Sequence, residues 1–179
     1  MVIKCNILMK MILFLIVFNC ISCTDTLQLT RTSITGNQLR LDGYYYDNYA
    51  SYENLDYIDP IILYSNGIIL HTGVEHSLRA IDSTFLDEKW LEYSKNRHDW
   101  WGIYQIEGNS IKIEKLYHSN AWFFHAYIRS GKILNDTTFI INSVERSGKP
   151  WTKEEKILRV YHFRHFSIKP DSTNRFIKY

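Results

Sequence analysis

Two segments of the chain carry side chains that could bind a small molecule: "AWFFHAYIR" at 121–129 and "LRVYHFRHF" at 158–166. Successive side chains on a strand point to opposite faces, so alternate residues of each segment would gather on one face. Aromatic walls with a few convergent polar groups are typical of small-ligand sites. The sequence therefore predicts a site for an apolar molecule with an anionic end. The residues of this predicted site are Phe123, His125, Tyr127, Arg129, Arg159 and Tyr161.

A second interpretation of the same segments is a filled core. The opposite face of the first segment also carries aromatic side chains, Trp122 and Phe124. Both faces would then be at least partly covered, and the aromatic side chains would serve packing alone.

Metal and catalytic chemistry have weaker support. The chain has seven histidines, but His162 and His165 are three apart on a predicted strand and would point to opposite faces. No cysteine follows Thr24, and no histidine pair has a zinc-site spacing. There is also no Gly-x-Ser-x-Gly elbow and no phosphate-binding loop. We predict no metal site, no cofactor and no catalytic residue, and an enzyme ranks last.

The beginning of the chain has the features of a secretory signal. Lys4 and Lys10 precede the apolar run "MILFLIVF" at 11–18. A basic start followed by a short apolar core indicates an export signal, and spanning a bilayer requires about 20 apolar residues. We predict a signal peptide at residues 1–22.

The end of this signal resembles a bacterial lipobox, in which a small residue precedes the lipidated cysteine. Ser22 and Cys23 match that pattern, and the resemblance implies that Cys23 carries the lipid. Cys20 is the alternative lipidated residue, and an ordinary cleaved signal or an uncleaved anchor are the alternative processing routes. Several acyl chains on one cysteine would give stable membrane attachment. The predicted location is the bacterial cell envelope, with the outer membrane favoured over the inner.

Charge excludes one class of partner. Lys4 and Lys10 account for the whole net charge of +2, so the rest of the chain is neutral. Nucleic-acid binding requires concentrated positive charge, and we predict no nucleic-acid partner.

The elements that must position the predicted site are strands. Apolar runs flank Asn66-Gly67 and Gly108-Asn109, which are typical hairpin turns. About eight such strands predict an antiparallel up-and-down barrel, with a β-sandwich as the alternative. The spacing of apolar residues after Asp82 predicts one helix over 83–96. Residues 23–38 are polar and predict a tether, and residues 39–179 form the single β-barrel domain.

Four features between Leu39 and Phe166 resemble small lipocalin-like lipoproteins of Bacteroidetes-type bacteria. They are Gly43-Tyr44-Tyr45, the Asn66-Gly67 hairpin, "WGIYQIEGNSIKI" and "GKILNDTTFII". The resemblance implies a barrel and an envelope location, and it supplies no catalytic residue.

Two functions remain open. The first is a binding module that holds a small apolar or amphipathic ligand in the barrel. The second is a structural lipoprotein with a filled barrel that contacts protein or glycan through the tyrosine-rich stretch 44–57, interpreted as a loop.

Overall fold

The computed structural model describes residues 25–50, 56–120 and 123–178. These residues contain eight strands and two short helices. Their bounds are β1 Gly43–Ala50, β2 Asp56–Leu63, β3 Ile68–His71, α2 Leu78–Phe85, α3 Glu88–Ser94, β4 Trp101–Glu107, β5 Ser110–Asn120, β6 Phe123–Asn135, β7 Thr138–Arg146 and β8 Glu155–His165.

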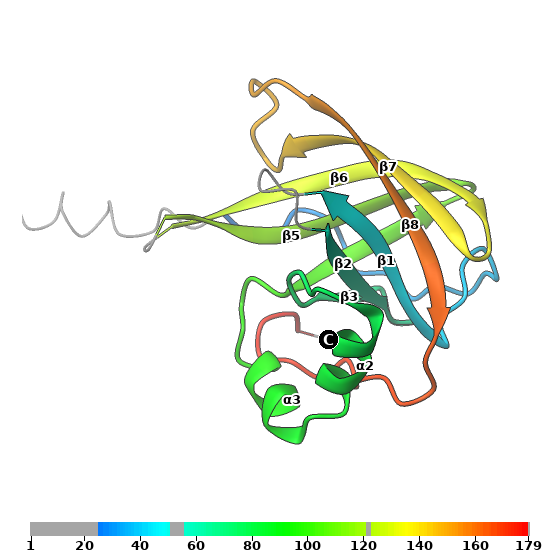
Figure 1. Cartoon of the computed structure of the whole chain (residues 1–179). Helices are drawn as coiled ribbons and strands as arrows, with labels where there is room; N and C mark the ends of the chain where they lie inside the picture. Colours follow the sequence, from blue (N-terminus) through cyan, green and yellow to red (C-terminus); the bar gives the residue numbers. More distant parts are fainter. Residues whose placement is uncertain (1–24, 51–55, 121–122, 179) are drawn as a thin grey trace, which may run out of the picture.

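The strands form a closed antiparallel barrel in chain order (Figure 1). Each strand pairs with the next one, and β8 returns to pair with β1, with Tyr45 opposite Phe163. Closure removes the free edges that would otherwise pair with other chains. The predicted up-and-down barrel is confirmed, and the sandwich alternative is wrong. Gly67 has φ +78°, as the predicted Asn-Gly hairpin turn requires.

The single helix predicted at 83–96 is wrong, because two helices occupy this region. Ser77 caps α2, and its hydroxyl accepts a hydrogen bond from the Ala80 amide at 3.1 Å. Asp87 then takes an extended conformation and caps α3, accepting from the Lys89 amide at 2.8 Å. A second N-cap inside the apolar pattern ends one helix and begins another. Both helices lie outside the barrel, below β3 in the view of Figure 1.

Side chains alternate between two apolar cores along the strands, as the pleat requires. One core fills one end of the barrel interior, which we call the floor. Its buried members are Leu39, Tyr45, Ile61, Leu63, Ile69, Tyr104, Ile111, Ile113, Ile133, Phe139, Ile141 and Tyr161. The other core lies on the outer wall beneath the helices. Its buried members are Tyr44, Ile62, Tyr64, Ile68, Leu70, Ile81, Phe85, Trp101, Ile103 and Ile177.

The N-terminal part of the described chain also contributes to the floor. Ile34, Leu39 and Leu41 pack into it. The Tyr45 hydroxyl hydrogen-bonds the backbone carbonyl oxygens of Arg40 at 3.1 Å and Asp136 at 2.9 Å. This end of the lumen is therefore closed by packed apolar side chains.

The segment predicted as a tether, residues 23–38, is described from Asp25 onward and lies along the barrel. The buried Glu114 carboxylate on β5 accepts hydrogen bonds from the Gln28 amide at 2.8 Å and the Leu29 amide at 2.6 Å. At the opposite end from the floor, Asp25 forms an ion pair with Arg146 at 3.1 Å. The outer wall thus holds this segment by charge-assisted hydrogen bonds.

The tyrosine-rich stretch is not a loop over its described part. Tyr44, Tyr45, Tyr46 and Tyr49 lie on β1, and Tyr57 lies on β2. The side chains of Tyr44 and Tyr45 are buried in the two cores. β-branched and aromatic side chains suit a pleated surface, and here that preference outweighs the polar residues between them.

Candidate functional site

A layer of polar side chains lies in the lumen directly above the floor. On several strands, the residue two positions from a floor residue, on the side away from the floor, is charged or polar. Asp47 follows Tyr45, Asp59 precedes Ile61 and Lys115 follows Ile113, because neighbouring strands run in opposite directions. Residues two apart on a strand share a face, so these side chains point into the lumen. We call this group the polar layer. Its members are Asp47, Asp59, His71, Lys115, Tyr117, Arg129, Arg159 and the hydroxyl of Tyr161, whose ring belongs to the floor.

Asp59 is the central acceptor of the polar layer. It accepts hydrogen bonds from His71 Nε2, from Arg159 Nη2 at 3.0 Å and from the Tyr161 hydroxyl at 3.0 Å. Burial opposes ionisation of this carboxyl, but contact with His71 and the charges of Arg129 and Arg159 outweigh it. The pKa of Asp59 therefore lies well below its usual range.

His71 connects Asp59 to Lys115. Burial lowers the pKa of His71 to about 4, so its ring is neutral at physiological pH. A neutral ring has one donor and one acceptor, so Nε2–H donates to Asp59 and Nδ1 accepts from Lys115 Nζ at 2.9 Å. The neighbouring carboxylate fixes this tautomer.

Lys115 is buried, and the absence of a side chain at Gly102 leaves space for it. It pairs across the sheet with Gly102, where a Cβ atom would lie 2.7 Å from the Lys115 Cβ. Burial, reinforced by the charge of Arg129, lowers the pKa of Lys115 to about 7. The amine is therefore close to half-protonated near neutral pH.

The charges of the polar layer are unevenly paired. Arg159 forms ion pairs with both Asp47 and Asp59. Lys115 and Arg129, by contrast, have no carboxylate oxygen within 4.0 Å among the residues that the structure describes. Two cations of one lumen therefore lack an acidic partner there.

Lys115 and Arg129 flank the same aromatic ring. Lys115 Nζ lies 4.4 Å and Arg129 Cζ lies 5.0 Å from the ring centroid of Tyr117. The Tyr117 hydroxyl is buried, and no described residue hydrogen-bonds it. Burial raises the pKa of Tyr117 to about 12, so the hydroxyl keeps its proton and can donate. The three groups together place two basic side chains and one hydroxyl donor side by side.

The structure brings three of the six predicted site residues together in this layer. The Arg129 guanidinium lies 3.5 Å from the Tyr161 hydroxyl, and the Arg159 guanidinium lies 6.0 Å from the Tyr161 ring centroid. Tyr127 lies beyond the layer and packs edge-on against Tyr117 at 5.8 Å.

The other two predicted residues lie farther from the layer. His125 contacts Arg146 at 2.8 Å and Asp25 at 3.5 Å, so it is engaged with the N-terminal segment. Phe123 begins β6 and is 38% exposed.

The end of the barrel opposite the floor is where β5 ends and β7 leads towards β8, and we call it the mouth (Figure 1). The Arg159 side chain is 18% exposed, and Arg129, Tyr117 and Tyr127 are also only partly buried. A hollow of about 280 Å³ at the mouth is lined by Tyr127 of β6, by residues 144–146 of β7 and by Thr152, Lys153 and Glu155, and no residue of the polar layer lines it. The polar layer is therefore closed by the floor on one side and accessible to solvent on the other.

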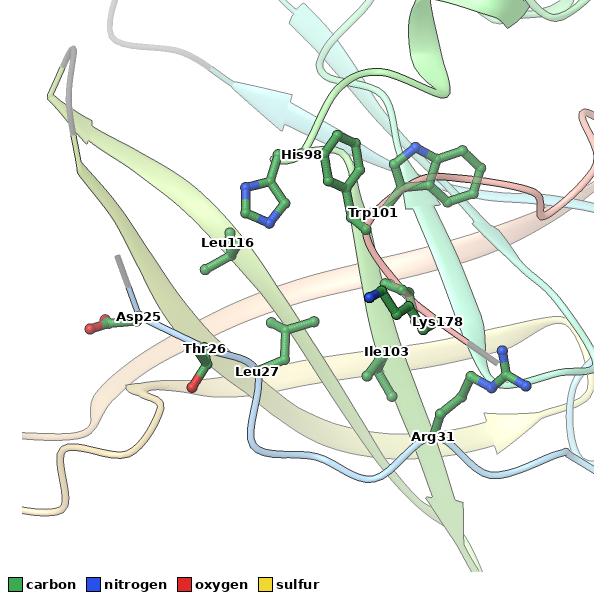
Figure 2. Close-up of a pocket in the computed structure, with 11 residues that line it drawn as sticks. Asp25, Thr26, Leu27, Arg31, His98, Trp101, Ile103, Leu116 and Lys178 are labelled. Atoms are coloured by element: carbon green, nitrogen blue, oxygen red, sulfur yellow. The ribbon is translucent and has the colours of Figure 1, made fainter. Parts of the chain in front are cut away.

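A second cavity, of about 570 Å³, lies outside the barrel (Figure 2). Leu27 of the N-terminal segment, Ile103 and Leu116 of the outer wall, and Phe176 near the C-terminus form its apolar lining. No residue of the polar layer lines it. It is a separate cavity between the chain ends and the wall.

Neither a metal site nor a spanning helix is found in the described residues. No group of three or more histidine, cysteine, aspartate or glutamate side chains there could hold a metal ion. None of the helices in the described ranges is long and apolar enough to cross a membrane. Cys23 and Cys20, the predicted and alternative lipidation sites, lie outside the described residues.

No family model matches the chain, and no curated protein or solved structure does.

Proposed function

We propose that this protein is an exported lipoprotein, anchored through Cys23 in the bacterial cell envelope, whose barrel binds a small amphipathic ligand with an anionic end. The ligand enters at the mouth, places its polar end on Lys115, Arg129 and Tyr117, and leaves its apolar part among the aromatic side chains above them.

The observation that carries this proposal is the pair of lumen cations without an acidic partner. A buried cation without a partner costs several kcal/mol, because it gives up its hydration without gaining a counter-charge. Arg159 avoids this cost through Asp47 and Asp59. An anionic ligand beside Lys115 and Arg129 would supply the acidic partner that the described residues do not provide. Hydrogen bonds from the two side chains to this ligand would be charge-assisted.

The shape of the lumen supports the same function. The floor is packed with apolar side chains, so a ligand cannot pass through it. Above the polar layer, Tyr127 borders the hollow at the mouth. Apolar walls with a few placed polar groups are the usual composition of a small-ligand site.

Replacing Arg129 by methionine is expected to weaken binding of decanoate about tenfold or more, because a hydrogen bond to a charged group contributes about 1.5–3 kcal/mol. Titration calorimetry with decanoate and with the uncharged decanol measures both affinities, and decanol binding should change little. Arg175→Met is the matched control, since Arg175 is exposed and lies outside the barrel strands. Absence of binding by both probes to the unaltered protein would contradict the proposed function.

The anchor has its own test. We expect Cys23→Ala to abolish acylation and to move the protein out of the membrane fraction, because the several acyl chains are then absent. Intact-mass spectrometry of protein from a lipoprotein-processing bacterium measures the acyl mass. Cys20→Ala is the matched control and should keep both properties. Acylation that persists in Cys23→Ala, or disappears in Cys20→Ala, would show that the lipidated residue is not Cys23.

A further inference from the structure

Asp59, His71 and Lys115 form a continuous hydrogen-bonded chain that ends in an amine. Asp59 accepts from His71 Nε2, and His71 Nδ1 accepts from Lys115 Nζ at 2.9 Å. A carboxylate that orients a neutral histidine, which in turn accepts a proton from a third group, is the arrangement that activates nucleophiles in enzymes. Here the third group is a buried lysine.

We propose that the Lys115 amine condenses with aldehyde ligands in the lumen and holds them as an imine. This inference rests on the proposed function, because it requires that small ligands enter the barrel, and it adds amphipathic aldehydes to the ligands with an anionic end.

The reaction needs no partner other than the aldehyde. The lone pair of Nζ attacks the carbonyl carbon, and the carbonyl oxygen takes up a proton to give a carbinolamine. His71 Nδ1 accepts the second proton of the nitrogen and returns it to the hydroxyl, which leaves as water. One C–N double bond forms, the C–O bond breaks, and the nitrogen loses two protons to the released water. The buried Tyr117 hydroxyl can donate to the carbonyl oxygen during the attack.

The surroundings of Lys115 favour the reactive form of the amine. Only the unprotonated amine is a nucleophile, and an ordinary lysine at neutral pH is almost wholly protonated. Burial and the nearby charge of Arg129 lower the pKa of Lys115 to about 7, so a large fraction of the amine is free. The neutral imine also removes a positive charge from the neighbourhood of Arg129.

A ligand at the mouth has a short path to this amine. Lys115 lies directly opposite Tyr127 on the neighbouring strand, and Tyr127 lines the hollow at the mouth. Side chains of directly opposed residues start from Cβ atoms about 5 Å apart. An aldehyde held beside Tyr127 thus lies next to the strand position that carries Lys115.

Reductive trapping tests the inference on the full chain. The protein is incubated with decanal and sodium cyanoborohydride at pH 7, and the modified lysines are mapped by peptide mass spectrometry. We expect Lys115 to be modified about tenfold or more faster than the other lysines, because its amine is far less protonated. Lys115→Met should lose this fast site, whereas Lys112→Met, at an exposed position of the same strand, should keep it.

The outcomes separate the inference from the proposed function. Decanoate binding together with uniformly slow lysine modification overturns the imine and leaves the ligand-binding barrel standing. Absence of both overturns both. His71→Gln adds a second measurement: the trapping rate at Lys115 should fall relative to the rates at the exposed lysines of the same protein. An unchanged trapping rate in His71→Gln would show that the hydrogen-bonded chain plays no part. Mapping of the modified lysines on the unaltered protein tests the inference even if a variant does not fold.

Discussion

Asp59→Asn is expected to lower the free energy of unfolding by about 3–5 kcal/mol, the usual cost of removing one partner from a buried charge network. The substitution keeps the size of the side chain and removes its charge. Asp59 accepts hydrogen bonds from three groups, and Arg159 would lose one of the ion pairs that the structure describes for it. The polar layer would then hold more positive charge than its described acids balance.

Urea denaturation at pH 7 measures this loss. Asp136→Asn is the matched control, because Asp136 is exposed and removal of an exposed charge changes stability by about 0.5 kcal/mol or less. A loss for Asp59→Asn no larger than that of the control would show that the polar layer is well enough solvated to tolerate unpaired charge.

The second large effect is on the pH dependence of stability. The pKa of Lys115 is about 7 in the folded protein and 10.5 in its ordinary state. Between these values the unfolded chain binds a proton at this lysine that the folded chain does not, so the free energy of unfolding rises with pH through that window. The slope from one such group approaches about 1.4 kcal/mol per pH unit.

Comparison with Lys115→Met isolates this contribution from the other titrating groups. We expect the methionine variant to be more stable than the unaltered protein by about 1–3 kcal/mol at pH 6, where the buried ammonium is least favourable. The difference should shrink steadily as the pH rises to 9. Lys112→Met should show no such trend, because Lys112 is exposed in the folded protein. A difference that is constant from pH 6 to 9 would mean that Lys115 titrates like an ordinary lysine.

The barrel could be predicted from the sequence because its signals are local. Asn66-Gly67 and Gly108-Asn109 are hairpin turns, and alternation along each strand sets its faces. The helical region was predicted less well, since the apolar spacing continues through Asp87 and only the cap geometry shows that a helix begins there. The stretch 44–57 was interpreted as a loop, although the five tyrosines that the structure describes in it lie on β1 and β2.

The site was predicted only in part. Arg129, Arg159 and Tyr161 lie on long strands whose alternation is visible, and the structure brings them together. Asp59, His71 and Lys115 were missed, because several of their contacts join strands that are not consecutive in the chain. A signal did exist for Asp59: a carboxylate two residues before a floor residue points into the lumen. Its pairing with His71 and Arg159 depends on register and closure, which no short stretch of sequence determines.

The packed floor makes the barrel a cup and not a tube. Leu39, Tyr45 and Phe139 belong to the apolar side chains that seal it, so no route to the outside passes through the floor. In a barrel closed at one end, a bound ligand must dissociate through the mouth by which it entered. A competing ligand cannot displace it from the closed end. The rate of ligand exchange would then be limited by the dissociation rate of the bound ligand and would not depend on the concentration of competing ligands.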